Sequence, residues 1–388
     1  MKIAMFAPLL GVEATGQSLV VANTANQLAA AGHTVTVLAT DCGYRGSEVS
    51  QFVAFSPQVA VHIFPVTGAL NRRLYHSTEL IAWVYEHIAE FDVLDIHGIW
   101  SWSVGALADA FHIHRKPYVL TPHGAMTRYD WRKGRWKRAL FYRLKLSDVW
   151  NLADAVRFLS KGEEEQSYYP AHGRSAVVPN GVDVEPAPTA AQRTAARQQL
   201  GIASDSQVLL FLGRITHQKG VKEIVAAFSL AAQQLPNLRL YLVGPAEGRY
   251  GEEVLAQIQQ SPVRDRIVAP GAVFGDARND YFRAADAFIT LSHNEGLSLA
   301  HLEALAHGLP MVLTASSNLD QLEAYGAGIF TTHDPGQVAH DLVKLMADPA
   351  ALATAGAQAQ RLIAENFSWQ RVLPQLVALY QQTIDDRS

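Results

Sequence analysis

The sequence has a single cysteine, Cys42, so no disulfide can form within its 388 residues, which fits a reducing compartment. No apolar run reaches the ~20 residues that a membrane-spanning helix needs. The N-terminal MKIAMFAPLLG lacks the long apolar core and small-residue cleavage site of a signal peptide. The formal net charge of -4 provides no overall basic field to hold nucleic acid. These absences predict a cytoplasmic protein with no nucleic-acid partner, and they leave open a place at the inner face of the membrane.

Hydrophobic residues make up 49% of the chain, and its length exceeds that of one ordinary core, so two domains are expected. Continuous apolar strands between helical patterns are typical of parallel sheets covered by helices on both faces. The sequence therefore predicts an α/β protein with two doubly wound, Rossmann-like domains. The expected strands are KIAMFA, TVTVLAT, FDVLDIH, KPYVLTPHG, ADAVRFLS and SAVVPNG, and then QVLLFLGR, LRLYLVGP, RIVAPGAV, AFITLS, MVLTA and AGIFTT.

A break separates the two series of strands. An Asn-Gly turn is followed by EPAPTAA, which reads as a linker. We therefore predict an N-terminal domain over 1–183, a C-terminal domain over 184–366 and a final helical segment over 367–388. In such sheets ligands bind beyond the carboxyl ends of the strands, so the residues that follow the strands are the candidate binding residues.

Two cations follow the strand VLLFLG, in a loop bounded by glycines. Arg214 offers a planar fork to phosphate oxygens and Lys219 adds a mobile ammonium, so together they could neutralise a diphosphate. The loop is not a P-loop, because its spacing of glycines and Lys-Ser/Thr differs. The alternative is a pair of solvated loop cations.

A second group of candidate residues follows the strand AFITLS. Gly296, Leu297 and Ser298 stand at the start of a predicted helix, where backbone N–H groups can bind an anion. Glu295 precedes them and Glu303 lies about two turns into the helix. Carboxylates suit sugar hydroxyls better than phosphate, so we assign Glu303 to ribose hydroxyls and Glu295 to those of a transferred sugar. The alternatives are a solvated helix face for Glu303 and a dipole-favoured first-turn acid for Glu295.

These two groups together resemble one known family, the retaining family-four (group one) glycosyltransferases of the bacterial polysaccharide-biosynthesis type. That family has Gly-Arg, a short gap and Lys-Gly, then Ser-x-x-Glu-Gly, and a second glutamate after seven further residues. The likeness extends to AAAGHTVTV, PYVLTPHG, ADAVRFLS, VVPNGVD and FSWQ, and so covers nearly the whole chain. The matching residues are Gly213, Arg214, Lys219, Gly220, Ser292, Glu295, Gly296, Glu303, Ala304, Gly308 and Pro310.

The resemblance implies the GT-B fold, in which two Rossmann-like domains face a central cleft and the last helix crosses back onto the N-terminal domain. It also implies metal-independent transfer of a glycosyl group, with retention, from a nucleoside-diphosphate sugar to a saccharide or lipid-linked acceptor. The donor is then a co-substrate, with UDP as the default nucleotide, and no separate cofactor is expected. Arg214, Lys219 and Glu295 would act in catalysis together with a histidine of the N-terminal domain.

That histidine is His123, which matches the family's His-Gly position after a strand, where the imidazole points toward the donor sugar. A histidine can donate or accept a proton there near neutral pH. The family also carries a Gly-Gly turn near the donor phosphates, whose second glycine corresponds to Gly16, while Thr15 replaces the first. His97, which follows another strand, is a weaker candidate for contact with the acceptor.

The segment 128–145 is basic and aromatic, with eight Lys/Arg and one acid, Asp130. It could contact anionic lipid headgroups or a pyrophosphate-linked acceptor, as a peripheral membrane contact. The alternative is an ordinary helix that packs Trp136, Leu140, Phe141 and Leu144 inward and extends its cations into water.

Other classes of protein compete with this interpretation. A nicotinamide dehydrogenase needs a G-x-G-x-x-G turn after the first strand, and the sequence there reads GVEATGQS. A non-catalytic nucleotide- or glycan-binding protein on the same fold remains an alternative, because fold alone does not fix function. A phosphorylase or a sugar-nucleotide epimerase is a nearer alternative.

Overall fold

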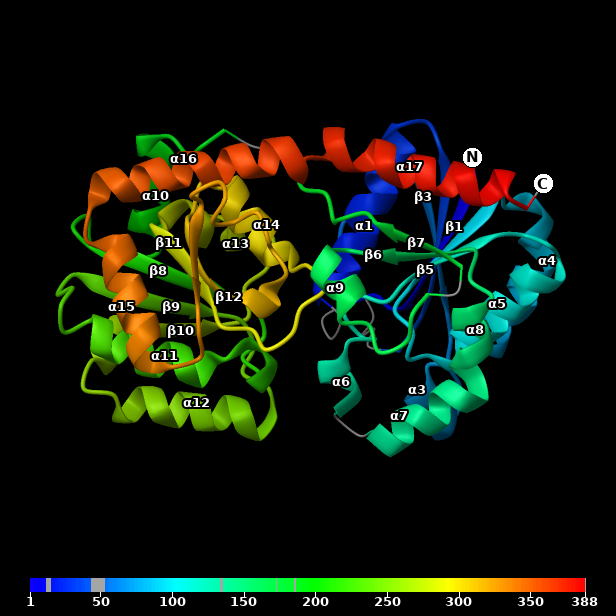
Figure 1. Ribbon diagram of the computed structural model, residues 1–388, viewed down its shortest axis with the longest axis horizontal. Coiled ribbons are helices and arrows are strands. Elements are labelled where there is room, and N and C mark those ends of the chain that lie inside the picture. The colour runs from blue at the N-terminus through cyan, green and yellow to red at the C-terminus, as the bar shows by residue number, and fades with distance from the viewer. Residues whose placement is uncertain (12–14, 43–52, 133–134, 172, 185, 388) are drawn as a thin grey trace. The chain divides into compact units, whose positions relative to one another are not determined.

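The chain forms two compact units in the computed structural model (Figure 1). Unit 1 consists of Met1–Gly181 together with Trp369–Ser388, and unit 2 consists of Val182–Ser368. The structure describes residues 1–11, 15–42, 53–132, 135–171, 173–184 and 186–387.

Unit 1 is built on one parallel sheet. Its strands are β1 (Lys2–Leu9), β2 (Thr34–Thr40), β3 (Val59–Phe64), β4 (Val93–His97), β5 (Tyr118–Thr121), β6 (Ala155–Phe158) and β7 (Arg174–Val177). They lie in the order β3-β2-β1-β4-β5-β6-β7, and every pair is parallel. The six strands expected in this half all form. The edge strand β3 was not predicted, because its residues are mostly half-buried and form no continuous buried run.

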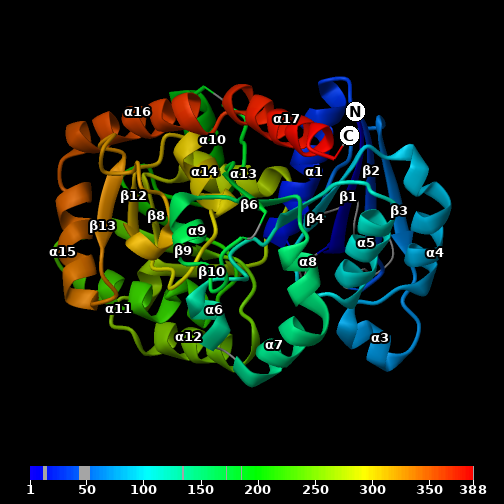
Figure 2. The same ribbon diagram turned by 45° about the vertical axis from the view of Figure 1, so that its right-hand side comes forward.

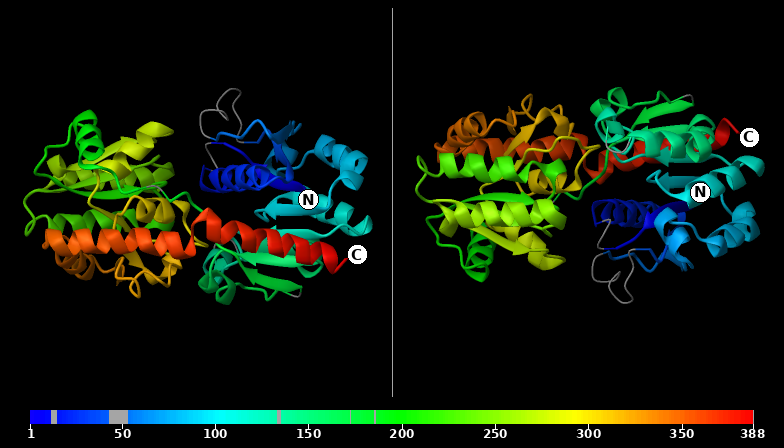
Figure 3. Two further views of the ribbon diagram at one scale, coloured as in Figure 1. Left: turned by 90° about the horizontal axis from the view of Figure 1, so that it is seen from above. Right: turned by 90° about the horizontal axis from the view of Figure 1, so that it is seen from below.

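Helices cover both faces of this sheet (Figure 2). On one face, buried residues of α4, α5 and α8 join a single apolar cluster with the sheet. On the other face, α1 and α17 supply buried residues that include Val21, Leu28, Val372 and Leu376, and α17 lies beside α1 (Figure 3). The helices of unit 1 are α1 (Thr15–Ala30), α3 (Ala69–Leu74), α4 (Thr78–His87), α5 (Trp102–Ile113), α6 (Arg128–Arg132), α7 (Arg135–Phe141), α8 (Ser147–Asn151), α9 (Lys161–Glu165) and α17 (Trp369–Asp385).

Unit 2 repeats this architecture with six parallel strands. They are β8 (Gln207–Leu212), β9 (Leu238–Val243), β10 (Ile267–Gly271), β11 (Ala287–Thr290), β12 (Met311–Thr314) and β13 (Gly328–Thr331), in the order β10-β9-β8-β11-β12-β13. All six were expected. The helices are α10 (Ala190–Gln199), α11 (Val221–Ala231), α12 (Gly248–Gln260), α13 (Asp276–Ala284), α14 (Leu299–Ala306), α15 (Pro335–Met346) and α16 (Pro349–Asn366).

Helix starts in unit 2 are encoded locally. Thr189 and Gln192 form a reciprocal capping box at the start of α10. Asp334 caps α15, whose first residue is Pro335, the position where a missing N–H costs nothing. These local signals mark where α10 and α15 begin.

The strand order reverses at one place in each sheet, between β1 and β4 in unit 1 and between β8 and β11 in unit 2. Loops that leave neighbouring strands in opposite directions open a crevice at such a point, which is where ligands of doubly wound sheets bind. The predicted site residues follow β8 and β11 in unit 2, and in unit 1 Gly16 follows β1 and His123 follows β5.

Candidate functional site

In unit 2 the loop after β8 and the loop after β11 are tied together. The backbone N–H of His293 donates to the carbonyl of Gln218 at 2.8 Å, and the Gln218 side-chain amide donates to the carbonyl of Asn294 at 2.8 Å. The two groups of residues predicted for a donor site therefore meet, although 76 residues separate Lys219 from Glu295.

Gly220 makes this approach of the two loops possible. Its φ is +64°, and a Cβ at this position would lie 2.2 Å from the carbonyl oxygen of Leu291, at the end of β11. No other residue fits here without a shift of the backbone. The glycine therefore positions Lys219, its neighbour, against the loop that carries Glu295.

Lys219 and Glu295 form a mostly buried ion pair. Lys219 Nζ lies 2.6 Å from Glu295 Oε1, and the Ser292 hydroxyl donates to the same oxygen at 2.8 Å. Burial raises the pKa of Glu295, but the charge of Lys219 and the hydrogen bonds from Lys219 and Ser292 outweigh burial, so the pKa lies below its ordinary value. The arrangement holds a charged carboxylate and an ammonium side by side.

Residues at the end of β12 and just after it support the loop that carries Glu295 through hydrogen bonds to its backbone. Asn318 donates its side-chain amide to the Glu295 carbonyl at 2.6 Å, and the Glu295 N–H donates to the carbonyl of Ser316 at 3.1 Å. Thr314 donates its hydroxyl to the carbonyl of Ser292 at 2.6 Å. These bonds fix the direction of the Glu295 side chain through its backbone.

Arg214 is held more loosely. Its guanidinium lies 3.4 Å from the Glu247 carboxylate, and both side chains are about half exposed, at 50% and 42%. Such exposed pairs contribute little to stability, so the guanidinium can turn to another anion at small cost. The alternative of a solvated loop cation describes Arg214 in this state, whereas it does not describe Lys219.

Glu303 is paired with an arginine that was not singled out in the sequence. Arg278, on α13, donates from Nη1 to Glu303 Oε1 at 2.8 Å, and its Nη2 contacts the other carboxylate oxygen. Both side chains are about four-fifths buried. Glu303 is therefore not on a solvated helix face, and its assignment to ribose hydroxyls stays a prediction. No motif signals Arg278, since a lone arginine in a helix is usually solvated.

The start of α14 lies between these two glutamates. Ser298 is its N-cap residue and makes no side-chain capping bond, and Leu297 before it is buried. The first turn of the helix carries partial positive charge on its N–H groups. Anion binding by the backbone at Gly296, Leu297 and Ser298 stays a prediction.

A buried histidine that was not predicted stands in α14. His301 is 1% exposed, and neither ring nitrogen has a hydrogen-bond partner among the described residues. Burial lowers the pKa of His301 to about 3, so the ring is neutral at physiological pH. Its sequence context is apolar, which gave no reason to place it near Glu295.

In unit 1, Gly16 lies in the first turn of α1 rather than in a turn before the helix. A Cβ at Gly16 would meet nothing within 4 Å, so open space adjoins it. Thr15 begins the helix, and residues 12–14 lie outside the described residues. Gln17 donates its amide to the carbonyl of His97 at 2.7 Å, which ties the start of α1 to the end of β4.

His123 ends a chain of buried hydrogen bonds. Its Nε2 lies 2.9 Å from His97 Nδ1, and His97 Nε2 lies 3.0 Å from the Asp95 carboxylate. The same carboxylate accepts a hydrogen bond from the hydroxyl of Tyr380 on α17, 285 residues further along the chain. His97 is fully buried and contacts His123, so it supports the His123 ring, and its contact with an acceptor stays a prediction.

This chain of bonds sets the protonation of His123. Asp95 remains charged because the pair with His97 and the Tyr380 hydrogen bond offset burial, so its pKa is about 2. Burial and the neighbouring His97 lower the pKa of His123 well below its ordinary value. The Asp95 carboxylate can only accept, so His97 Nε2 donates to it, and the facing nitrogens His97 Nδ1 and His123 Nε2 share one hydrogen, which leaves His123 Nδ1 outside this chain of bonds.

The backbone around His123 is strained and clamped. His123 has a φ of +53°, which is uncommon for a residue other than glycine. The buried Glu163 carboxylate accepts from the N–H of Gly124 at 2.5 Å and from that of Leu159 at 2.7 Å. Burial raises the pKa of Glu163 to about 7, although these two hydrogen bonds oppose the shift. The clamp holds the loop in the conformation that directs the His123 ring toward His97 at the end of β4.

The described residues of the basic segment 128–145 are helical, and its apolar residues do not all pack inward. Trp136, Leu140 and Leu144 are 69%, 52% and 63% exposed, so the expectation that they lie in the core is wrong. Phe141 is half-buried. Within the described residues, no helix is long and apolar enough to cross a bilayer.

Two family models match the chain, one on each half. The model for Glycosyltransferase Family 4 matches residues 14–186, and the model for Glycosyl transferases group 1 matches residues 192–362. A D-inositol 3-phosphate glycosyltransferase of Xylanimonas cellulosilytica is 35% identical over 221 residues, which cover 54% of this chain and 52% of the relative. An alpha-monoglucosyldiacylglycerol synthase of Streptococcus pneumoniae is 29% identical over 36% of this chain and 32% of the relative. The chain spans about half the length of the curated D-inositol 3-phosphate glycosyltransferases that it matches.

Solved structures share the whole architecture. Sucrose-phosphate synthase from Thermosynechococcus elongatus superimposes with a TM-score of 0.75 over 100% of both chains, at 21% identity. The Anabaena protein HepE, in complex with UDP and glucose, gives a TM-score of 0.78 over 98% of this chain and 99% of that one, at 20% identity. These likenesses confirm that the two Rossmann-like units are those of the GT-B fold.

Proposed function

Because this chain belongs to the glycosyltransferases of group 1 and family 4, we propose that it moves a glycosyl group from a nucleoside-diphosphate sugar to an acceptor hydroxyl, with retention of anomeric configuration. The observation that carries the proposal is the ion pair of Lys219 and Glu295, beside Arg214, where the strand order of unit 2 reverses. An ammonium can bind a phosphate and a neighbouring carboxylate can accept from a sugar hydroxyl. A nucleotide sugar carries these two groups side by side.

In this mechanism the bond between the sugar C1 and the diphosphate oxygen breaks, and the acceptor oxygen forms its bond to C1 on the same face. The acceptor proton passes to the departing phosphate oxygen, so no protein nucleophile is needed. Lys219 and Arg214 stabilise the charge that grows on the diphosphate, which is usually the largest contribution in such chemistry. These cations supply the positive charge that a divalent metal would supply, so we propose metal-independent transfer.

The remaining polar residues are proposed to orient the donor. Glu303, held by Arg278, accepts from the ribose hydroxyls, and Glu295 accepts from a hydroxyl of the transferred sugar. His123 presents its Nδ1 to another sugar hydroxyl. UDP is the proposed nucleotide, and the HepE complex with UDP supports this choice. The named relatives act on an inositol phosphate or make a glycolipid, which supports a phosphorylated, saccharide or lipid-linked acceptor.

The first experiment is a thermal-shift panel with UDP, GDP, ADP and CMP. A nucleotide at ~100 times its Kd should add about 2.7 kcal/mol of stability. Release of nucleoside diphosphate from the matching nucleotide sugar, with and without saccharide acceptors, then tests transfer, and NMR of the product reads the anomeric configuration. Chelation with EDTA should leave the rate unchanged.

Variants of the two cations test the phosphate assignment. Arg214→Ala and Lys219→Ala should each lower the transfer rate by about 100-fold, because one charge-stabilising donor is lost. Lys222→Ala is the matched control, since Lys222 lies in α11 and pairs with Glu253. Loss of Lys219 leaves the buried Glu295 carboxylate without its cation, which can destabilise the Lys219→Ala variant. Arg214 is exposed, so the Arg214→Ala variant should fold normally. Full activity of the Arg214→Ala, Lys219→Ala double variant would refute the assignment, and nucleotide binding without turnover would favour a non-catalytic protein.

A further inference from the structure

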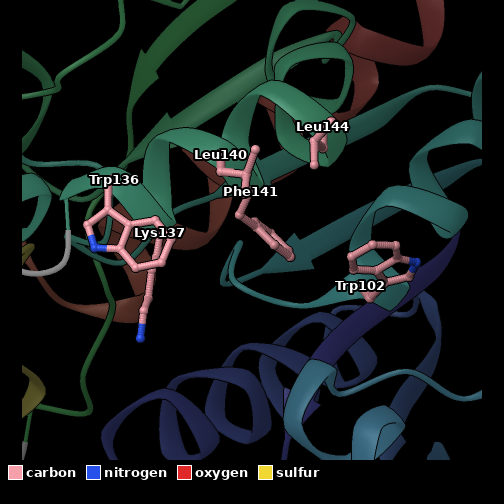
Figure 4. Close-up of a pocket in the computed structure, with 6 residues that line it drawn as sticks. All are labelled: Trp102, Trp136, Lys137, Leu140, Phe141 and Leu144. Carbon is pink, nitrogen blue, oxygen red and sulfur yellow. The ribbon is translucent and has the colours of Figure 1, made fainter.

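An exposed apolar strip lies on unit 1, outside the residues proposed for transfer. Trp136 and Leu140 project from α7, and Leu144 projects from the π-helical turn Tyr142–Leu146 that continues it (Figure 4). All three are more than half exposed. Large apolar side chains grouped on one surface commonly mark an interaction site, whereas single exposed ones do not.

A shallow apolar hollow adjoins the strip. Phe141 points toward Trp102 at the start of α5, with ring centroids 6.0 Å apart (Figure 4). The hollow is almost wholly apolar at its surface, so water gains little by filling it. Its lining residues are Trp102, Trp136, Lys137, Leu140, Phe141 and Leu144.

Cations accompany the strip along the same segment, and Lys137 lines the hollow itself. Among the described residues of segment 128–145, Arg138 lies 3.9 Å from the carboxylate of Asp130, while six other cations are exposed and form no ion pair with a described carboxylate. Lys145 Nζ lies 4.5 Å from the centre of the Trp102 ring, so cation and aromatic surface adjoin. The six exposed cations are Arg128, Arg132, Arg135, Lys137, Arg143 and Lys145.

We propose that this face, formed by the apolar strip, the hollow and the six cations, docks on the surface of an anionic lipid bilayer. An apolar strip rimmed by Lys/Arg is the pattern of a helix that lies in the interface, with its side chains in the acyl boundary and its cations at the headgroups. Trp136 suits that boundary because its indole combines an apolar body with a polar N–H. An apolar protein partner would not call for six cations, and nucleic acid would not call for the exposed leucines. The inference goes beyond the transfer reaction and does not depend on it.

The test is co-sedimentation of the full chain with phosphatidylcholine vesicles, with and without phosphatidylglycerol, at low and high salt. We expect binding to the anionic vesicles that weakens steeply with salt, since surface charges are screened. Binding should fall about tenfold or more in Arg135→Gln, Lys137→Gln, because each cation near an anionic surface adds to the attraction. A similar fall is expected in Trp136→Ser, Leu140→Ser, Leu144→Ser.

Matched controls stand elsewhere on unit 1. Leu70→Ser, Ile113→Ser removes apolar side chains of similar exposure, 70% and 68%, and Arg73→Gln, Arg371→Gln removes two exposed cations. Both control variants should bind like the wild type. Quenching of tryptophan fluorescence by brominated lipid, which should be reduced in Trp136→Phe, gives a second measurement that does not depend on the triple variant folding.

Two results would overturn the proposal. One is no binding to anionic vesicles at low salt, and the other is equal loss of binding in the test and control variants. Nucleotide-dependent thermal shifts should be the same in all of these variants. A protein that binds nucleotide but not vesicles would therefore refute the docking face and leave the proposed function standing.

Discussion

Single side chains in both candidate regions are held through other residues rather than by the backbone alone. Glu303 takes its direction from Arg278, Glu295 from Lys219, and His123 from His97. Buried charged or hydrogen-bonded groups are costly to leave unpaired, so removing one partner disturbs the other. The residues that hold the proposed substrate-binding groups are therefore as sensitive to substitution as those groups themselves.

Asp95→Asn should change which ring nitrogens of the His97–His123 pair carry a hydrogen, without moving the rings. An amide in place of the carboxylate can donate to His97 Nε2 as well as accept from it, so residue 95 no longer fixes which nitrogens of His97 and His123 carry hydrogens. We expect release of nucleoside diphosphate from the donor to slow by about tenfold or more, as when a carboxylate that fixes a histidine tautomer is lost. The tautomer is read from ¹⁵N NMR shifts of the histidines.

Two comparisons separate this effect from simple destabilisation. Tyr380→Phe removes a hydrogen bond to the same carboxylate but keeps its charge, so it should lower stability and leave the tautomer unchanged. Nucleotide binding, which is assigned to unit 2, should not change in either variant. A folded Asp95→Asn protein with wild-type turnover would show that the tautomer is irrelevant.

The sequence could identify the residues carried by motifs but not their partners. Lys219 and Glu295 were placed together because each follows a strand and neighbouring strands end at one edge. Arg278 and Tyr380 have no local signal, since their contacts span 25 and 285 residues and depend on how helices pack. The partners of a buried charge are set by tertiary packing, which periodicity does not encode.

At the scale of elements, the continuous apolar strands and the helices between them were predictable, because period and turn residues are local. The edge strand β3 was missed, since half-buried strands lack the apolar run. The alternative in which the apolar residues of segment 128–145 pack inward is wrong for Trp136, Leu140 and Leu144, which are exposed. The π-helical turn over Tyr142–Leu146 shifts the helical register, so a pattern read at 3.6 residues per turn misplaces Leu144.

Gly220→Ala should distort the loop that joins β8 to α11. The new Cβ would overlap the Leu291 carbonyl, and the φ of +64° is itself unfavourable for alanine, so we expect a loss of about 2 kcal/mol or more and a displaced Lys219. Gly248→Ala is the matched control, because Gly248 has a φ of +55° and nothing within 4 Å of its Cβ position. Urea unfolding and the nucleotide thermal shift measure both effects. Equal losses in the two variants would mean that the contact with Leu291 is unimportant.

At the scale of the whole molecule, the chain leaves unit 1 after Gly181 and returns at Trp369. The returning helix α17 buries Trp369, Val372, Leu376 and Tyr380 against unit 1. Burial of a large apolar side chain contributes about 1.5–3 kcal/mol, so these residues together contribute on the order of 8 kcal/mol. That is comparable with the whole stability of a typical domain.

Residues 1–181 produced alone should therefore fail to fold cooperatively, whereas residues 182–368 should fold, because every strand of their sheet lies within that range. Thermal unfolding followed by circular dichroism distinguishes the two fragments. Adding a peptide of residues 369–388 to the first fragment should restore a transition. A cooperative transition in 1–181 alone would contradict this expectation.

Tyr380 also sets an order of events during synthesis. The residues of unit 1 that emerge from the ribosome first lack α17 until Trp369–Asp385 have also emerged, so their apolar face stays uncovered while unit 2 is made. The hydrogen bond that reaches His123 through Asp95 and His97 can form only once Tyr380 has emerged. A ribosome that stalls late would thus leave a folded C-terminal half beside an N-terminal half that is open to chaperones and proteases.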